Sequence, residues 1–291
     1  MQNMIDISSW QKGLNLSELF SRNQDLGGVI VKATGGVSYV DPQCDGWVQW
    51  LIQNNKPWGF YHYMDDDYRD SDGKAEAEWF VKNTKNYFGH GIPFADYENP
   101  ASLKGTDYLK EFLDAVYELT GIKCGVYCSL SVVQMQDFTE IANAGYPLWV
   151  AQYADNNILN GFIDSPWQKG SFAPFQKIFM QQYSSHGRLN GWSGNLDFDK
   201  FFGTAEEWLA VASGHEEPEK KPVDPLVVSD VLNNRYGAGP ARVAALNNAG
   251  YDATDVQNKI NELYAIALSC KKFIDGNEDY INSIMKIVRA L

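Results

Sequence analysis

Two acidic residues stand two positions apart at the end of an apolar run that has the composition of a β-strand. The run covers residues 92–98 and ends in Asp96-Tyr97-Glu98. Alternate side chains of a strand share one face, so both carboxyls are expected on one side, with Cα atoms about 6.6 Å apart. Two carboxylates this close disfavour joint ionisation, which raises the pKa of one of them. A general acid beside a carboxylate is the pairing that cleaves glycosidic bonds, although a lone Asp-x-Glu at a strand end is more often a solvated cap.

Two further acids interrupt apolar strand-like runs at opposite ends of the same region. Asp6 lies in the first such run and Asp197 in the last. A charge inside an apolar strand is costly unless it is paired. If the strands close into a barrel, the first and last are neighbours, and both carboxyls could face Asp96 and Glu98. Each acid could instead cap a following turn, but acids at both seam positions favour an active-site cluster.

Aromatic residues recur at the ends of the same runs. They are Tyr61, Tyr63, Tyr127, Trp149, Tyr153 and Tyr183. Flat rings beside carboxylates suit stacking on sugar faces, whose C–H groups are apolar. Any one of these residues is more often core packing, but the set around one mouth predicts a carbohydrate cleft.

Short strand-like runs alternate with helical stretches over residues 1–208. Strands are expected at residues 4–7, 28–32, 58–63, 92–98, 125–128, 148–153, 178–183 and 195–198. Helices are expected between several of them, notably at residues 42–54, 73–87, 103–119 and 130–142. This alternation predicts an α/β fold with a mostly parallel sheet, and eight strand candidates favour a (β/α) barrel. In such barrels the reactive side chains lie on loops at the carboxyl ends of the strands.

The chain changes character near residue 213. Its 291 residues carry a net charge of −13, of which residues 1–213 account for −11, and all nine tryptophans precede that point. Three prolines and mixed charges in residues 213–225 predict a semi-rigid linker. We therefore expect a catalytic barrel at residues 1–212, a linker at 213–225 and a small all-α domain at 226–291.

The excess of acids restricts the partners. Duplex nucleic acid is bound by lysines and arginines that neutralise phosphates, so nucleic acid is not expected as a ligand. No window reaches the roughly 18 apolar residues of a membrane span, so no membrane partner is expected. The histidines and cysteines show no metal-ligand spacing, and neither a metal nor a cofactor is expected. The acidic run at residues 65–73 fails as an EF-hand and is expected to be a solvated loop on the rim of the groove.

Residues 226–291 are expected to be wholly helical. Ser229 and Asp252 are predicted helix N-caps, and the helix after Asp252 carries an apolar stripe at spacings of 4, 3, 4, 3 and 4. The stripe consists of Val256, Ile260, Leu263, Ala267, Cys270 and Ile274. A last amphipathic helix is expected through residues 281–291. Such a stripe is usually core, yet it also fits packing between subunits, so a homo-oligomer through these helices stays open.

The first region resembles the lysozymes of glycoside hydrolase family 25, which are muramidases common among phage endolysins. The resemblance covers residues 1–208 and follows eight segments in the family's order. They are Ile5-Asp6-Ile7-Ser8-Ser9-Trp10-Gln11, Val31-Lys32-Ala33-Thr34-Gly35-Gly36, Gly59-Phe60-Tyr61-His62-Tyr63, Asp96-Tyr97-Glu98, Gly125-Val126-Tyr127, Leu148-Trp149-Val150-Ala151-Gln152-Tyr153, Gln181-Gln182-Tyr183 and Leu196-Asp197-Phe198-Asp199. The chain departs from the family at Gly35, where Glu is frequent, and at Asp199, where Asn is frequent.

The resemblance implies an irregular α/β barrel with a substrate groove across its C-terminal face. It implies that Glu98 donates a proton to the leaving glycosidic oxygen, and that Asp96 assists as nucleophile or by orienting the 2-acetamido group of the substrate. Asp6 and Asp197 would complete the carboxylate cluster. The candidate substrate-binding residues in these segments are Tyr61, Tyr63, Tyr127, Trp149 and Gln182. The implied reaction is hydrolysis of the β-1,4 bond between N-acetylmuramic acid and N-acetylglucosamine in bacterial peptidoglycan.

A second resemblance covers residues 226–264, which are similar to a cell-wall-binding repeat of phage lysins. Its most specific part is Ala249-Gly250-Tyr251-Asp252, followed by Val256-Gln257. It implies binding of peptidoglycan, with Arg242, Tyr251 and Asp252 as candidate contacts, although Tyr251 is equally plausible as a helix-packing residue. The helical tail at residues 265–291 lies outside the repeat.

Together the two resemblances imply a phage-type endolysin. The first ten residues lack the basic and apolar regions of a secretory signal, so synthesis in the host cytoplasm and holin-dependent release to the wall are expected. Two alternatives stay open. One is a non-catalytic wall-binding protein on a barrel scaffold, and the other is a glycosidase of another N-acetylhexosamine polymer such as chitin.

Overall fold

A computed structural model describes residues 1–66, 71–214 and 220–277 of the chain. The chain divides into two compact units, Met1–Glu217 and Pro218–Leu291, and each is described here by itself. The first unit contains the strands and seven of the described α-helices, and the regular elements described in the second unit are helices. The linker expected at residues 213–225 stays a prediction.

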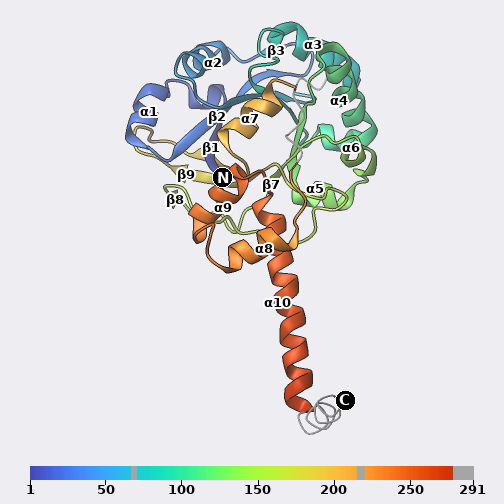
Figure 1. Ribbon diagram of the computed structural model, residues 1–291. Helices are drawn as coiled ribbons and strands as arrows, with labels where there is room; N and C mark the ends of the chain where they lie inside the picture. Colours follow the sequence, from blue (N-terminus) through green and yellow to red (C-terminus); the bar gives the residue numbers. More distant parts are fainter. Residues whose placement is uncertain (67–70, 215–219, 278–291) are drawn as a thin grey trace, which may run out of the picture. The chain divides into compact units, whose positions relative to one another are not determined.

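Eight strands of the first unit close into a barrel (Figure 1). They are β1 (Gln2–Ile7), β2 (Leu26–Gly35), β4 (Trp58–Tyr63), β5 (Ile92–Asp96), β6 (Gly125–Ser129), β7 (Leu148–Ala151), β9 (Met180–Arg188) and β10 (Leu196–Phe201). The pairing order is β1-β10-β9-β7-β6-β5-β4-β2, and β2 pairs with β1 to complete the ring. Two short strands, β3 (Tyr39–Val40) and β8 (Leu159–Asn160), pair with β2 and β9. The predicted α/β barrel is confirmed.

The last barrel strand runs against its neighbours. β10 is antiparallel to both β1 and β9, whereas the remaining pairs around the ring are parallel. The expected mostly parallel sheet is therefore correct, and the seam is its exception. Because β10 is reversed, the start of this strand lies at the same end of the barrel as the carboxyl ends of the other seven.

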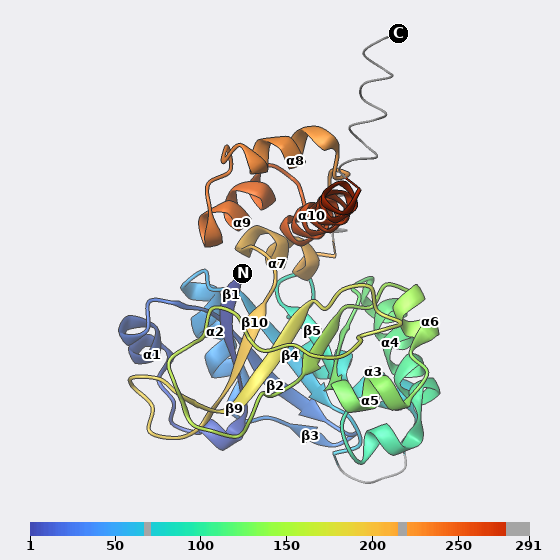
Figure 2. The same ribbon diagram turned by 90° about the horizontal axis from the view of Figure 1, so that it is seen from below.

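Helices surround the barrel and close one end of it (Figures 1 and 2). The α-helices are α1 (Leu16–Arg22), α2 (Cys44–Gln53), α3 (Gly73–Thr84), α4 (Thr106–Thr120), α5 (Leu130–Met135), α6 (Thr139–Asn143) and α7 (Ala205–Ala212), and the 3-10 turns are η1 (Ser9–Gln11) and η2 (Ala101–Lys104). The helix expected at 130–142 is two helices, since Gln136 adopts an extended conformation that ends α5. The helix expected from residue 103 starts as α4 only after Gly105, whose φ of 88° is not helical.

Apolar side chains form separate cores outside and inside the barrel. The outer core packs the helices on the sheet, and the inner core includes Met4, Phe94 and Phe201 from three strands. Trp208 of α7 completes the inner core and donates its indole N–H to the carbonyl oxygen of Trp58, over 2.9 Å. Helix α7 therefore plugs the barrel at the end where β4 begins, and the opposite end is left for the groove.

The described part of the second unit is a bundle of three helices. They are α8 (Pro225–Leu232), α9 (Gly239–Asn248) and α10 (Ala253–Gly276). Asp252 caps α10 as predicted, accepting from the amide of Thr254 over 2.8 Å. The predicted cap at Ser229 is wrong, because α8 already begins at Pro225 and Asp224 caps it. The last helix, expected through residues 281–291, lies outside the described residues.

The apolar stripe of α10 divides into a buried and an exposed part. Val256 and Ile260 join the small core of the bundle, whereas Leu263 is 42% exposed and Cys270 is also exposed. Among the described residues, no helix is both long and apolar enough to cross a membrane.

Candidate active site

A groove with a volume of about 850 Å³ opens at the end of the barrel opposite α7. Its lining comes from nearly every strand of the ring, together with the segments that follow β1 and β4. All four predicted catalytic acids line it, namely Asp6, Asp96, Glu98 and Asp197. Residues separated by as many as 191 positions in the chain thus meet around one opening.

The barrel topology accounts for the meeting of these acids. Asp6 and Asp197 are direct partners in the antiparallel register of β1 and β10. Asp96 is the last residue of β5, and Glu98 lies beyond the strand rather than in it. The amide of Tyr97 still donates to the carbonyl oxygen of Tyr127 over 2.8 Å, which holds the turn that presents Glu98. Asp6 and Asp96 are buried, and Glu98 is exposed to the groove.

Removal from water raises the pKa of every acid in the cluster, and the charges of neighbouring acids add to this effect at Asp6, Asp96 and Asp197. Burial raises the pKa of Asp6 to about 6, and burial with the charges of Asp6 and Glu98 raises that of Asp197 to about 8. Burial and the charges of Glu98 and Asp6 raise the pKa of Asp96 well above its ordinary value. Partial desolvation raises the pKa of Glu98, against a hydrogen bond with Asp96. The cluster therefore retains protons near neutral pH.

A lysine on β2, Lys32, adds a positive charge to the groove. Lys32 pairs with Asp66 over 2.8 Å, its ammonium lies 4.5 Å from the ring centre of Tyr63, and its charge lowers the pKa of Asp96. Gly35 makes room for this pair, since a Cβ atom there would lie 2.3 Å from Asp66 Oδ2. Sequence reasoning missed Lys32 as a site residue. A lysine inside an otherwise apolar strand was the available signal.

The acidic run after β4 is less solvated than expected. Asp66 lines the groove, and Asp65 is buried and pairs with Lys104 over 3.0 Å. Both carboxylates have therefore been drawn into ion pairs. Residues 67–70 of the run lie outside the described residues.

A hydrogen-bond network lies under the groove, on its β9 side. Gln182 donates to Asp6 over 2.7 Å, and its side-chain oxygen accepts from the hydroxyls of Tyr127, over 2.7 Å, and Tyr153. Because the two tyrosine hydroxyls donate to the side-chain oxygen of Gln182, the NH2 group of this amide faces Asp6. The carboxylate of Asp6 is thereby oriented by three side chains from other parts of the barrel.

The predicted substrate-binding residues all line the groove, but they differ in accessibility. They are Tyr61, Tyr63, Tyr127, Trp149 and Gln182. Tyr63 is only half-buried, whereas Trp149 is 2% exposed and donates its indole N–H to Asp199. Little of the Trp149 ring is therefore available to a ligand. Tyr183 belongs to the outer core and does not line the groove, so its expected place at the mouth is wrong.

One exposed aromatic residue was overlooked. Trp10, on η1, lines the groove and is 92% exposed. Its turn is held by Ser8, which caps η1, and by Asp41, which accepts from the amide of Ser9 over 2.8 Å. Its place directly after the strand of Asp6 was the signal that could have identified it.

Comparison with known proteins agrees with this geometry. The profile of the glycosyl hydrolases family 25 matches residues 5–192. The chain belongs to glycosyl hydrolase family 25. The predicted enzyme class, a glycoside hydrolase of the lysozyme type, is confirmed.

Individual relatives support the same assignment. A lysozyme of Streptococcus phage Cp-7 is 27% identical over 266 residues, which cover 89% of this chain and 69% of the relative. The lysozyme M1 of Streptomyces globisporus is 25% identical over 240 residues, covering 72% of this chain and 70% of the relative. The crystal structure of the bacterial lysozyme from Streptomyces coelicolor has the same fold, with a TM-score of 0.61 and 24% identity over 74% of this chain and 98% of that one.

The second unit of this family 25 enzyme has its own match. A CW_7 repeat matches residues 226–264, the range in which the cell-wall-binding repeat was expected. The chain thus joins a peptidoglycan-hydrolysing domain of the endolysin type to a cell-wall-binding region. Within that region Arg242 donates to Gln257 over 2.7 Å, Tyr251 packs against the helical core, and Asp252 caps α10.

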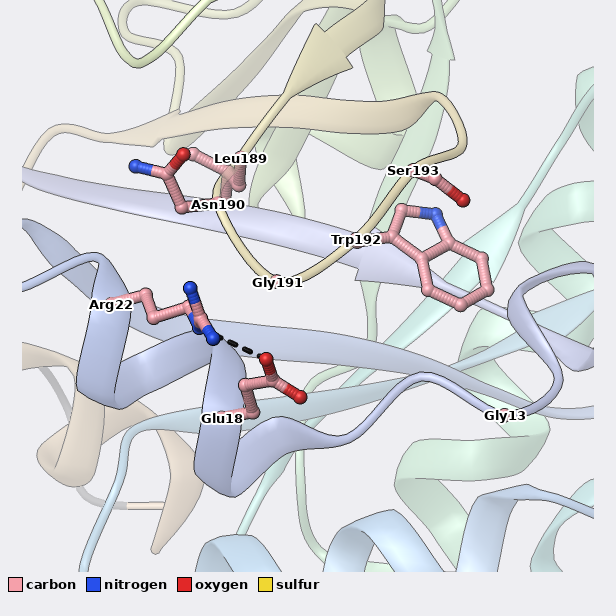
Figure 3. A pocket seen from close by; sticks show the side chains of 8 residues that line it. All are labelled: Gly13, Glu18, Arg22, Leu189, Asn190, Gly191, Trp192 and Ser193. Atoms are coloured by element: carbon pink, nitrogen blue, oxygen red, sulfur yellow. Dashed lines mark ion pairs between the residues drawn. The ribbon is translucent and has the colours of Figure 1, made fainter.

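The family 25 unit has a second, more open hollow beside α1 (Figure 3). It lies between α1 and the turn that joins β9 to β10, and its volume is about 580 Å³. Glu18 and Arg22 of α1 point toward each other in a 2.9 Å ion pair, and Asn190 and Trp192 belong to the turn. None of the four clustered acids lines this hollow, so the groove remains the candidate active site.

Proposed function

We propose that this family 25 enzyme is an endolysin that hydrolyses the β-1,4 bond between N-acetylmuramic acid and N-acetylglucosamine in bacterial peptidoglycan. The proposal rests on the cluster of Asp6, Asp96, Glu98 and Asp197 around one groove, all with raised pKa values. Glycoside hydrolysis needs a carboxyl that is still protonated at the working pH beside one that is ionised. A cluster of four carboxyl groups of which only some are ionised meets this need.

In the proposed reaction Glu98 donates its proton to the leaving glycosidic oxygen. Of the four acids it is the one on the loop beyond the strands, where a bound glycan can reach it. A glycan in the groove would displace further water and raise the pKa of Glu98 again. Asp96 acts on the other side of the sugar, either as nucleophile or by orienting the 2-acetamido group. Asp6 and Asp197 complete the charge distribution of the site.

Lysis of purified cell walls, followed by turbidity, tests the role of Glu98. Glu98→Gln keeps the shape of the side chain and removes the acidic proton that it would donate. We therefore expect the rate of wall lysis to fall about 100-fold or more. Glu140→Gln is the matched control, because Glu140 is an exposed glutamate on α6 that does not line the groove. Wild-type lysis by Glu98→Gln would overturn the assignment of the acid.

Azide rescue separates the two roles of Asp96. With Asp96→Ala, azide can occupy the place of the lost carboxylate and attack the sugar. Azide then enters from the face opposite the leaving group, so a glycosyl azide of α configuration, inverted from the β-linked substrate, would identify Asp96 as the nucleophile. Absence of that product, with residual hydrolysis, would identify participation of the 2-acetamido group instead.

Mass spectrometry of wall digests separates the proposed function from its alternatives. Muramidase cleavage leaves reducing ends of N-acetylmuramic acid. Reducing N-acetylglucosamine, or faster cleavage of chitin than of walls, would indicate a glycosidase of another N-acetylhexosamine polymer. Wall binding without any new reducing end would indicate a non-catalytic wall-binding protein.

We propose that the CW_7 repeat contacts the wall through Arg242, with Tyr251 and Asp252 as further candidate contacts. Arg242 is a half-buried cation on α9 that is held by Gln257. Arg242→Ala is expected to reduce co-sedimentation of the full chain with walls several-fold. Arg235→Ala is the control, since Arg235 pairs with the exposed face of α8 at Asp230 over 2.8 Å. Equal loss in both variants would argue against a specific role for Arg242.

We further propose that the exposed part of α10 pairs with a second copy of the chain. Its exposed large apolar residues are Leu263, Tyr264, Ile266, Leu268 and Phe273. Apolar side chains that repeat along a helix favour burial between helices. Light scattering of the full chain should give a dimer or higher oligomer, and Leu263→Glu should reduce it to a monomer. A monomeric wild type would remove this proposal.

A further inference from the structure

An acid that is no part of the predicted catalytic set lies directly beneath it. Asp199 follows Asp197 by two positions on β10, and both side chains face the barrel interior, as Phe201 does. Asp6 opposes Asp197 in the register of β1 and β10, so Asp199 is its diagonal neighbour on the same face. The side chain of Asp199 is 0% exposed and does not line the groove.

The two carboxyl oxygens of Asp199 have different surroundings. Oδ1 accepts the indole N–H of Trp149 over 2.8 Å. Oδ2 is buried and meets no hydrogen-bond donor among the described residues. The carboxyl group of Asp6 is its neighbour, and the two groups are within hydrogen-bonding reach. Two ionised carboxylates cannot share such a position, but one acid and one carboxylate can, because the acid supplies the missing donor.

The surroundings also decide which of the two groups holds the proton. Asp6 lines the groove and receives a hydrogen bond of 2.7 Å from Gln182, which favours its charged form. Asp199 has only the Trp149 bond and no access to water. The more deeply buried acid with fewer donors keeps the proton.

We propose that Asp199 is a positioning residue that works as a neutral carboxylic acid, accepting from Trp149 at Oδ1 and donating its proton from Oδ2 to the carboxylate of Asp6. With Gln182 as the second donor, Asp6 is then held from the inner side, and its remaining lone pairs face the groove. This inference rests on the proposed function only in that Asp6 serves the reaction.

The proposal has a consequence for pH dependence. The titratable groups whose charges act on Asp199 are Asp6 on β1 and Asp197 on β10, and the charge of Asp199 in turn raises the pKa values of Tyr153, beyond β7, and of Tyr183 on β9. Ionisation of either aspartate disfavours ionisation of Asp199, in addition to the effect of burial. When Asp199 does lose its proton at alkaline pH, Asp6 loses a donor and gains an adjacent negative charge. Activity should therefore decline on the alkaline side as Asp199 titrates.

An amide reproduces the neutral acid without its titration. The oxygen of an asparagine can accept from Trp149, and its NH2 group can donate to Asp6. A leucine, which has the same branching at Cγ but is larger and apolar, offers neither. The pair of variants Asp199→Asn and Asp199→Leu therefore separates the hydrogen bonds from the packing and from the charge.

The experiment measures kcat and KM of wall lysis against pH for the full-length wild type and both variants. Asp199→Asn is expected to rescue the activity that Asp199→Leu loses, and to move the alkaline limb up by about one pH unit or more. Asp199→Leu is expected to lower kcat about 100-fold, with little change in co-sedimentation with walls. Near-ultraviolet circular dichroism checks that both variants are folded, and if Asp199→Leu fails to fold, the profile of Asp199→Asn decides.

Two outcomes would overturn the proposal. If Asp199→Asn keeps the wild-type alkaline limb, the titration of Asp199 does not govern activity. If Asp199→Asn loses as much activity as Asp199→Leu, the negative charge of Asp199 is required and the neutral acid is wrong. Infrared spectroscopy adds a direct readout, because a buried neutral carboxyl has a carbonyl band that Asp199→Asn should remove. Glu98→Gln tests the proposed function separately, since it leaves this band in place.

Discussion

At the scale of single residues, the properties of the groove depend on the protons that its acidic side chains retain. Burial and mutual charge raise the pKa values of Asp6, Asp96 and Asp197 in the folded chain. In the unfolded chain the same groups return to their ordinary range. The folded state therefore binds more protons than the unfolded state between the two sets of pKa values, and this difference couples stability to pH.

Asp197 gives the clearest test of this coupling, since its pKa rises from an ordinary value of 3.8 to about 8. Its contribution to stability is fully present below pH 4 or so and is lost as the pH rises toward 8. Asp197→Asn cannot titrate, so the melting temperature of the variant relative to wild type should increase between pH 5 and pH 8. Calorimetric unfolding of both proteins over this range measures the difference. A constant difference would mean that Asp197 has an ordinary pKa in the folded state.

At the scale of elements, β2 and the segment after β4 together place the cation of the groove. Lys32 reaches the cluster from β2, and Asp66 holds it. The close approach of Asp66 to the backbone of β2 depends on the absence of a side chain at Gly35. The ion pair of Lys32 and Asp66 therefore depends on the positions of both β2 and the loop after β4.

Gly35→Ala tests this pairing. The new methyl group would meet Asp66 Oδ2 at 2.3 Å, so the carboxylate must move and release Lys32. We expect wall lysis to fall about tenfold or more, because catalysis is sensitive to small displacements of charged groups. Gly46→Ala in α2 is the control, since a Cβ atom there meets nothing within 4 Å, and it should raise stability by about 0.4–1 kcal/mol. Equal activity in both variants would argue against the role of Gly35.

The positions of the barrel strands along the chain, and the acids at their ends, could be predicted from the sequence because both depend on local patterns. Apolar runs of strand length mark the eight barrel strands, and an acid within such a run is conspicuous at Asp6 and Asp197. The reversal of β10 left no local signal, since a strand reads alike in both directions. The sequence likewise has no local signal for the break of the predicted helix at Gln136.

The missed site residues depend on tertiary contacts. Trp10 and Lys32 each had a weak local signal, but their roles become evident only where a turn exposes Trp10 at the groove and where Asp66 pairs with Lys32 from another loop. The partners of Asp199, namely Trp149 and Asp6, lie on strands that are distant in sequence. Tyr183 shows the opposite error, since alternation along β9 turns it outward while Gln182 faces in.

At the scale of the whole molecule, the charge of −13 is concentrated in the barrel region, where residues 1–213 carry −11. Bacterial walls are themselves often anionic, so bulk attraction cannot bring enzyme and substrate together. Recognition must then come from contacts with sugar and peptide that act at short range and are little screened by salt.

Salt therefore provides a test of how the wall is recognised. Co-sedimentation of the full chain with purified walls should change little between about 50 and 500 mM NaCl. Arg242→Ala should weaken binding by a similar factor at both concentrations. A steep loss of wild-type binding with salt would show that ion pairs with the wall dominate.

The closure of the barrel by β10 and α7 also determines how short an active fragment can be. The family match ends at residue 192, before Asp197 on β10 and Trp208 on α7. A fragment cut at residue 192 would leave β1 and β9 with unpaired edges and the inner core open to water. It should therefore aggregate rather than act as a smaller enzyme, and the shortest useful domain for engineering extends through Ala212.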